Sequence, residues 1–226
     1  MINTFHINMN MNFCPMLLNR ITTKGFRALW LAALGIVMSS LLGCSSGGGS
    51  ASGGSGGASS ASKVLVIGDS IGTGFGLAVP YPDRIQQSTG VTLINDSADG
   101  RVTAEGAARV VSLISLHKPT HLIVLLGTND ARVGSVSGAL RNLQYMIEVA
   151  NSSGVTAVVG TLPPYLTTAA LNLRSEQISN GIRALSGARI AEVRNSLGDG
   201  STTIADGVHP NDLGQQIIAD TFVAQL

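Results

Sequence analysis

The chain has 226 residues, of which 44% are hydrophobic, and its formal net charge is +1 at pH 7. The only charged residues before Lys63 are Arg20, Lys24 and Arg27, so residues 63–226 hold 11 basic and 13 acidic side chains, a net charge of −2. A mildly acidic body lacks the clustered basic surface of a nucleic-acid-binding protein. The hydrophobic content excludes a disordered chain. Nucleic acid is therefore not an expected partner.

The N-terminal segment has the pattern of an export signal. Its three basic residues precede an uncharged apolar run of 15 residues, 28–42, which is shorter than the roughly 20 residues of a membrane-spanning helix. The run ends in Leu41-Leu42-Gly43-Cys44. This ending resembles the bacterial lipoprotein signal, in which the cysteine is lipidated and becomes the mature N-terminus.

We therefore expect residues 1–44 to be a lipoprotein-type signal peptide that ends at the lipobox cysteine, Cys44. The mature protein would be an exported bacterial lipoprotein that contacts the membrane through a lipid anchor on Cys44, and Ser45 favours the outer membrane, facing the periplasm. A plain secretory signal and a single membrane anchor are the alternatives. Met16 is an alternative start that would give a more usual leader.

The segment 45–62 contains only serine, glycine and alanine. This composition cannot bury a core and predicts a flexible linker. Both cysteines, Cys14 and Cys44, precede residue 63, so neither a disulfide nor a cysteine metal site can form within 63–226. We expect these 164 residues to fold as one domain whose stability comes from core packing.

In 63–226, short β-branched runs alternate with longer stretches of helical periodicity. The alternation predicts a parallel sheet covered by helices on both faces, with ligands beyond the carboxyl ends of the strands. The predicted strands are 63–67, 91–94, 121–126, 156–160 and 189–193, and the predicted helices are 103–116, 136–150, 171–185 and 212–223.

Polar, glycine-bearing segments follow these strands or precede the last helix. A serine hydroxyl needs a base to become a good nucleophile, and histidine is the side chain suited to that task at neutral pH. Ser70 and His209 are the candidates, and Asp206 lies three residues before His209, where it can orient the imidazole. The expected oxyanion hole consists of the N–H groups of Ser70 and Gly100 and the side-chain amide of Asn129.

Four motifs at this order and spacing resemble the SGNH hydrolase family, also called GDSL esterases and lipases. They are Gly68-Asp69-Ser70, Asn95-Asp96-Ser97-Ala98-Asp99-Gly100, Gly127-Thr128-Asn129-Asp130 and Asp206-Gly207-Val208-His209-Pro210. The resemblance implies a flavodoxin-like three-layer α/β/α sandwich with a parallel five-stranded sheet. It also implies a carboxylic ester hydrolase that acts on a small ester or thioester without a metal or organic cofactor.

Short connections and the absence of a lid pattern favour short to medium acyl chains, and lysophospholipids, acyl thioesters and acetylated glycans are all candidate substrates. Two other interpretations stay open. Gly68-Asp69-Ser70-Ile71-Gly72 also fits the nucleophile elbow of α/β-hydrolases. A catalytically silent lipoprotein of the same fold would bind a ligand without reacting.

Further residues near the motifs have simpler expected roles. Arg101 is a candidate for recognising an anionic substrate, whereas Asp69 and Asp130 are expected to stabilise their loops. The segment 163–165, Pro-Pro-Tyr, is a candidate pocket wall. His117 and His121 fall at the opposite ends of the strands, so we expect surface roles for them.

Overall fold

The structure is a computed structural model that describes residues 62–226. The expected signal peptide, Cys44 and the linker up to residue 61 lie outside the described residues. None of the helices within 62–226 is both long and apolar enough to cross a membrane.

Five parallel strands form one sheet in the order β2-β1-β3-β4-β5. Side chains of the inner strands are almost fully buried, as expected for a sheet covered on both faces. The order is that of flavodoxin-like folds. Their ligands lie between β1 and β3, at the point where the order in which strands are added to the sheet reverses. The bounds are β1 (Lys63–Gly68), β2 (Thr92–Ser97), β3 (His121–Leu125), β4 (Thr156–Gly160) and β5 (Ala188–Ala191).

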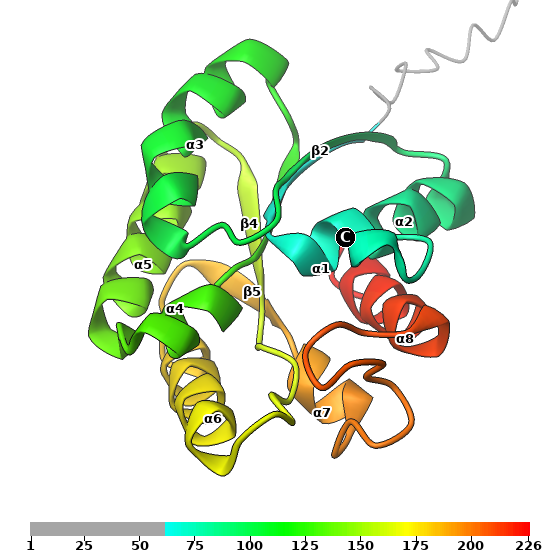
Figure 1. The fold of residues 1–226 in the computed structure, drawn as a ribbon. Coiled ribbons are helices and arrows are strands. Elements are labelled where there is room, and N and C mark those ends of the chain that lie inside the picture. Colours follow the sequence, from blue (N-terminus) through cyan, green and yellow to red (C-terminus); the bar gives the residue numbers. More distant parts are fainter. Residues whose placement is uncertain (1–61) are drawn as a thin grey trace, which may run out of the picture. The chain divides into compact units, whose positions relative to one another are not determined.

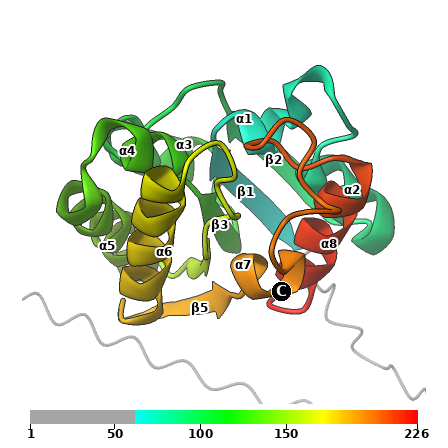
Figure 2. The same ribbon diagram turned by 60° about the horizontal axis from the view of Figure 1, so that its bottom comes forward.

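Helices cover both faces of the sheet and complete three layers (Figure 1, Figure 2). One face carries α3 (Thr103–His117), α5 (Val136–Ser152) and α6 (Ala169–Arg183), with the short α4 (Thr128–Val133) beside them. The other face carries α2 (Tyr81–Thr89), α7 (Val193–Leu197) and α8 (Asp212–Val223). The short α1 (Ser70–Thr73) and the 3-10 turn η1 (Gly74–Gly76) follow β1 directly.

The predicted architecture is confirmed, and the differences lie at element ends and in α1, α2, α4 and α7, which the periodicity does not predict. β2 is longer than predicted because Asn95, Asp96 and Ser97 pair with the last residues of β1 instead of forming a loop. The last strand ends at Ala191, and Val193 already belongs to α7. The helix α2 has no clear apolar periodicity, because its nine residues are largely polar and include Pro82, although proline is well tolerated in a first helical turn.

The helix α3 packs unusually close to the sheet at Gly106. A Cβ atom at this position would lie 2.6 Å from Leu126 Cδ1 and 3.2 Å from Ile67 Cγ2. Because Thr103, which begins α3, lies next to the carboxyl ends of the strands, this close packing also fixes one side of the candidate site.

Gly106→Ala is therefore expected to lower the free energy of unfolding by about 1–2 kcal/mol, since overpacking outweighs the gain in helix propensity. Gly138→Ala in α5 is the matched control, because its Cβ would meet only the movable Ser135 hydroxyl and main-chain entropy favours alanine by up to about 1 kcal/mol. Urea unfolding of both variants measures the two effects. Equal stability of Gly106→Ala and the wild type would contradict the close packing.

Candidate active site

The loops that carry the predicted residues meet at the carboxyl edge of the sheet. Ser70 begins α1 directly after β1, and His209 lies in the loop that leads into α8. Figure 2 shows α1 and this loop side by side at the upper edge of the sheet. Residues 139 positions apart in the sequence are thereby brought into contact.

The turn between β1 and α1 fixes the position of Ser70. Asp69 caps the helix: its Oδ1 accepts a hydrogen bond from the Ile71 N–H at 3.0 Å, and its carbonyl accepts one from the Gly72 N–H. The N–H of Ser70 belongs to the first turn of α1, whose amide groups have no acceptor within the helix. Ser70 is 8% exposed and lines a pocket.

The turn 206–209 carries both the predicted acid and the predicted base. Oδ1 of Asp206 accepts hydrogen bonds from the backbone N–H groups of Val208 at 2.9 Å and His209 at 2.7 Å. Gly207 has a φ of 88°, a left-handed conformation that glycine adopts without strain. The main chain therefore holds the carboxylate beside the imidazole.

The three predicted side chains form one hydrogen-bonded line. Oδ2 of Asp206 lies 2.7 Å from Nδ1 of His209, and Nε2 of His209 lies 3.0 Å from Oγ of Ser70. An ionised carboxylate can only accept, so Nδ1 carries the proton and Nε2 is left to accept the hydrogen bond from the serine hydroxyl. This is the geometry that a nucleophile, a general base and an orienting acid require.

Asp206 is ionised at neutral pH, because its pKa is lowered. Partial burial acts to raise its pKa, but the hydrogen bonds from the backbone and ring N–H groups of His209 and from the Val208 N–H lower it to about 2. The carboxylate is therefore negative and able to offset positive charge on the imidazole.

The predicted oxyanion donors lie in the same pocket as Ser70. Gly100 has a φ of 75°, and nothing lies within 4 Å of where its Cβ would be, so its backbone is open to a ligand. One hydrogen of the Asn129 amide is donated to the carbonyl of Arg101 at 3.1 Å. The other amide hydrogen remains for a ligand.

A buried contact ties the two oxyanion segments together. The carboxylate of Asp130 accepts hydrogen bonds from the Thr103 N–H at 2.9 Å and the Thr103 hydroxyl at 2.7 Å. Asn142 donates to the same hydroxyl at 3.0 Å. This agrees with the loop-bracing role expected for Asp130, and it joins the start of α3 to α4, which carries Asn129.

Arg101 does not face the pocket, which corrects its candidacy for recognising an anionic substrate. Its side chain is only 10% exposed and donates to both the carbonyl and the carboxylate of Asp96, with a longer contact to the carbonyl of Gly68. Because the guanidinium is engaged with the ends of β1 and β2, it stabilises the loop of Gly100 instead of binding substrate.

The candidate site opens into a pocket of about 210 Å³. Apart from the predicted residues, its walls include Phe75, Tyr165 and Val208. Tyr165 was an expected wall residue, whereas Pro163 and Pro164 of the same segment are buried and do not line the pocket. No sequence pattern points to Phe75 beyond its position between two glycines.

Gln215 is a supporting residue that the sequence analysis missed. It is fully buried in α8, its Oε1 accepts a hydrogen bond from the Tyr81 N–H at 2.8 Å, and its Nε2 donates to the carbonyl of Ile71 at 3.0 Å. One side chain thus joins the helix after His209 to the helix that begins with Ser70. The only sequence signal for this role is a glutamine that shares a helix face with Ile218 and Phe222. The signal can be recognised only if the buried face of α8 is already known.

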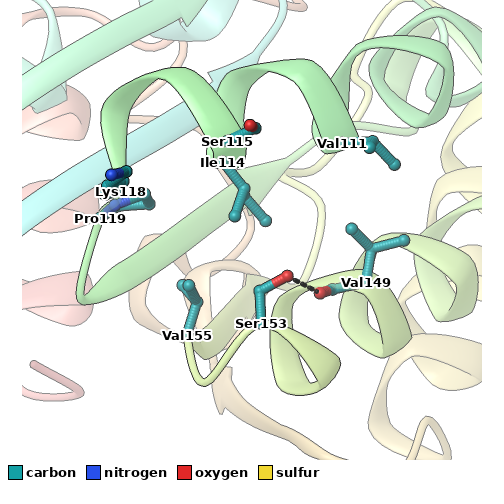
Figure 3. A pocket seen from close by; sticks show the side chains of 8 residues that line it. All are labelled: Val111, Ile114, Ser115, Lys118, Pro119, Val149, Ser153 and Val155. Atoms are coloured by element: carbon teal, nitrogen blue, oxygen red, sulfur yellow. Dashed lines mark hydrogen bonds between the residues drawn. The ribbon is translucent and has the colours of Figure 1, made fainter.

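A larger hollow, of about 510 Å³, lies at the other end of the molecule between the C-terminal ends of α3 and α5 (Figure 3). Its walls are valine, isoleucine, proline, serine and lysine side chains, including Val111, Ile114 and Lys118. This lining includes no histidine or carboxylate, so it offers no base for the reaction. His117 and His121 lie at this end, as expected.

Fold and site together define the SGNH class of hydrolases: a five-stranded parallel sandwich with a serine after the first strand and an aspartate and a histidine on one turn before the last helix. A family model described as the GDSL-like Lipase/Acylhydrolase family matches residues 66–217, and the chain belongs to this family. This match and the position of Ser70 after the first strand of the described sheet also decide against the α/β-hydrolase interpretation.

Several known proteins resemble the chain. An arylesterase of Vibrio mimicus is 32% identical over 107 residues, which cover 44% of this chain and 54% of the arylesterase. Thioesterase 1/protease 1/lysophospholipase L1 of Escherichia coli K12 is 30% identical over 102 residues, 41% of this chain and 48% of that protein. The matches thus span about half the length of these relatives.

Among solved structures, a member of the lipolytic protein G-D-S-L family from Veillonella parvula superposes with a TM-score of 0.64 at 20% identity. The superposition covers 73% of this chain and 97% of that one. At this identity the likeness supports the fold, which is the three-layer fold expected from the sequence.

Asp69 is the one carboxyl group of the site with a strongly raised pKa. Complete burial raises its pKa to about 7, against the lowering effect of the hydrogen bond from the Ile71 N–H. Its Oδ2 has no partner among the described residues. The folded protein therefore holds a proton here that the unfolded chain releases above about pH 4.

Asp69 therefore lowers the free energy of unfolding as the pH rises from about 4 to 7, because over that range the unfolded state loses the proton and the folded state keeps it. Asp69→Asn removes the titration while keeping an acceptor for the Ile71 N–H. We therefore compare the melting temperature of Asp69→Asn with that of the wild type at two pH values. The variant's advantage over the wild type should be at least about 4 °C larger at pH 8 than at pH 5. A difference independent of pH would contradict the raised pKa.

Proposed function

We propose that the protein is a serine carboxylic ester hydrolase that cleaves esters or thioesters of short to medium acyl chains. The observation that carries the proposal is the hydrogen-bonded line from Asp206 through His209 to Ser70, opening on a pocket that also holds Gly100 and Asn129. Membership in a family of lipases and acylhydrolases supports the same reaction class.

In the proposed reaction, Oγ of Ser70 attacks the acyl carbonyl while Nε2 of His209 takes the hydroxyl proton. The imidazole then carries a positive charge, which the ionised carboxylate of Asp206 offsets at Nδ1. His209 returns the proton to the departing alcohol or thiol and leaves an acyl group on Ser70. Water activated by the same base releases the acid.

Negative charge develops on the carbonyl oxygen during both steps. The N–H groups of Ser70 and Gly100 and the free amide hydrogen of Asn129 are the proposed donors to it. Fixed donors of this kind are worth roughly 10²-fold to 10³-fold each in turnover. The Asp130–Thr103 contact supports the proposal, because it fixes the loops that carry two of the three donors before a substrate arrives.

The size of the pocket supports a preference for small acyl groups. About 210 Å³ lies below the usual range of roughly 300–1,000 Å³ for sites that enclose drug-sized ligands. The relatives are named as an arylesterase and as a thioesterase and lysophospholipase, so both oxygen esters and thioesters are reasonable substrates. The aromatic rings of Phe75 and Tyr165 provide apolar walls for an acyl or aryl group.

Ser70→Ala is expected to lower the turnover of p-nitrophenyl butyrate by at least about 10³-fold, because it removes the nucleophile but leaves the fold intact. Ser115→Ala, in the hollow at the far end of the molecule, is the matched control and should keep the wild-type rate. Initial rates on acetate, butyrate, octanoate and palmitate esters give the chain-length preference. Wild-type rates no higher than those of Ser70→Ala on every ester would instead favour a silent binding protein.

We further propose that the protein is exported and anchored through a lipid on Cys44, with the linker 45–62 holding the hydrolase domain, 63–226, near the membrane. The proposal rests on the lipobox-like sequence Leu41-Leu42-Gly43-Cys44 and on the composition of the linker. Such a tether of 18 residues would span roughly 25 Å on average.

Cells that express the chain and are fed an alkyne-labelled palmitate should incorporate the label into the wild type but not into Cys44→Ala. Cys14→Ala is the control, because Cys14 lies within the expected signal peptide but outside the lipobox-like sequence, and its loss should not change labelling. Equal labelling of wild type and Cys44→Ala would contradict the anchor.

A further inference from the structure

Phe75 stacks on the imidazole of the proposed base. Its ring centroid lies 3.8 Å from that of His209, and the two planes are within 10° of parallel. The ring is 46% exposed, so it is not a core residue. One face of the phenyl ring contacts the flat face of the His209 imidazole.

The backbone at this position is strained. Phe75 has a φ of 47° and a ψ of 27°, the left-handed region that phenylalanine seldom adopts. It lies between Gly74, with a φ of 76°, and Gly76, with a φ of 70°. Glycine could occupy the middle position without steric cost, and a half-exposed ring gains little from burial, so neither local conformation nor the core explains a phenylalanine here.

The turn is held rigidly despite the strain. Oγ1 of Thr73 accepts a hydrogen bond from the Phe75 N–H at 3.3 Å and donates one to Asp99 at 2.6 Å. The Leu77 N–H donates to the carbonyl of Gly74 at 2.9 Å. Because Asp99 immediately precedes Gly100, the loop that holds a proposed oxyanion donor also anchors the turn that carries Phe75.

The two hydrogen bonds of the imidazole leave one motion free. Asp206 holds Nδ1 and Ser70 holds Nε2, so the ring can still tilt about the line that joins the two nitrogens. A second ring lying parallel on one face restricts that tilt. It also keeps water from that face of the base.

A phenyl face interacts differently with a neutral ring and with a cation. Two neutral aromatic rings prefer offset or edge-to-face arrangements to a close parallel one. A cation over the face of a phenyl ring is attracted by the ring quadrupole. The phenyl face therefore stabilises the imidazolium that forms when His209 takes the serine proton more than it stabilises the neutral imidazole before the reaction.

We propose that Phe75 is a positioning residue for His209: its ring fixes the tilt of the imidazole and stabilises the positive charge that develops on it during acyl transfer. The inference rests on the proposed serine hydrolase function. Because this stabilisation arises mainly in the transition state, we expect the stack to raise kcat and to leave substrate binding nearly unchanged.

The test compares Phe75→Leu, which has a similar size but no π face, with Phe75→Tyr, which keeps one. On p-nitrophenyl butyrate, Phe75→Leu should lower kcat about tenfold and change KM by less than about threefold, whereas Phe75→Tyr should stay within about threefold of the wild type in both. Labelling of Ser70 by a fluorophosphonate should slow about tenfold in Phe75→Leu as well, because that reaction uses the same base.

Phe75→Gly separates positioning from folding. Glycine relieves the left-handed strain, so its melting temperature should stay within about 3 °C of the wild type while kcat falls as in Phe75→Leu. Leu77→Ala, at a residue of the same segment that is 49% exposed and outside the pocket lining, is the control and should keep both kcat and the labelling rate.

The outcomes distinguish the two proposals. A wild type that the fluorophosphonate labels on Ser70, with Phe75→Leu labelled at the same rate, overturns the role of Phe75 and leaves the hydrolase function standing. A loss confined to KM also overturns it, because the ring would then act only as a substrate wall. A wild type that neither reacts with the probe nor hydrolyses any ester overturns the proposed function and this inference with it.

Discussion

The buried carboxamide of Gln215 is the contact on which the arrangement of the site depends. It bonds to backbone groups of two other helices, at Tyr81 and Ile71, and so fixes how α8 docks against the segment that follows Ser70. A buried amide that loses a partner costs roughly 1–3 kcal/mol, which makes a shifted register of α8 unfavourable. His209 precedes α8 by only three residues, so the 3.0 Å distance to Ser70 follows from this docking.

The site is built from two separately supported halves. The proposed nucleophile, Ser70, and the turn 206–209 are joined through α1 and α8. Gly100 and Asn129 are joined through the contact between Thr103 and Asp130. The halves meet between β1 and β3, where the flavodoxin-like order leaves a crevice at the carboxyl edge. The halves also contact each other directly, because Thr73 in the helix of Ser70 donates a hydrogen bond to Asp99 beside Gly100.

Most of the architecture and the proximity of Ser70, Asp206 and His209 could be predicted from sequence, because apolar periodicity gives the strands and parallel strands present their ends at one edge. Other features depend on tertiary contacts that no local pattern encodes. The pairing of Arg101 with Asp96 requires that β2 extend to Ser97, which its polar residues do not suggest. The stack of Phe75 on His209 needs a left-handed turn that glycine would ordinarily supply.

The 139-residue separation between Ser70 and His209 also makes the site a reporter of complete folding. The serine comes from the first strand and the base from the segment after the fifth, so the pair forms only when the whole sheet is in place and α8 has docked. Closing so long a loop is entropically costly and comes late in folding. A partly assembled or partly melted domain would keep much of its secondary structure and yet hold an isolated serine, remote from its base.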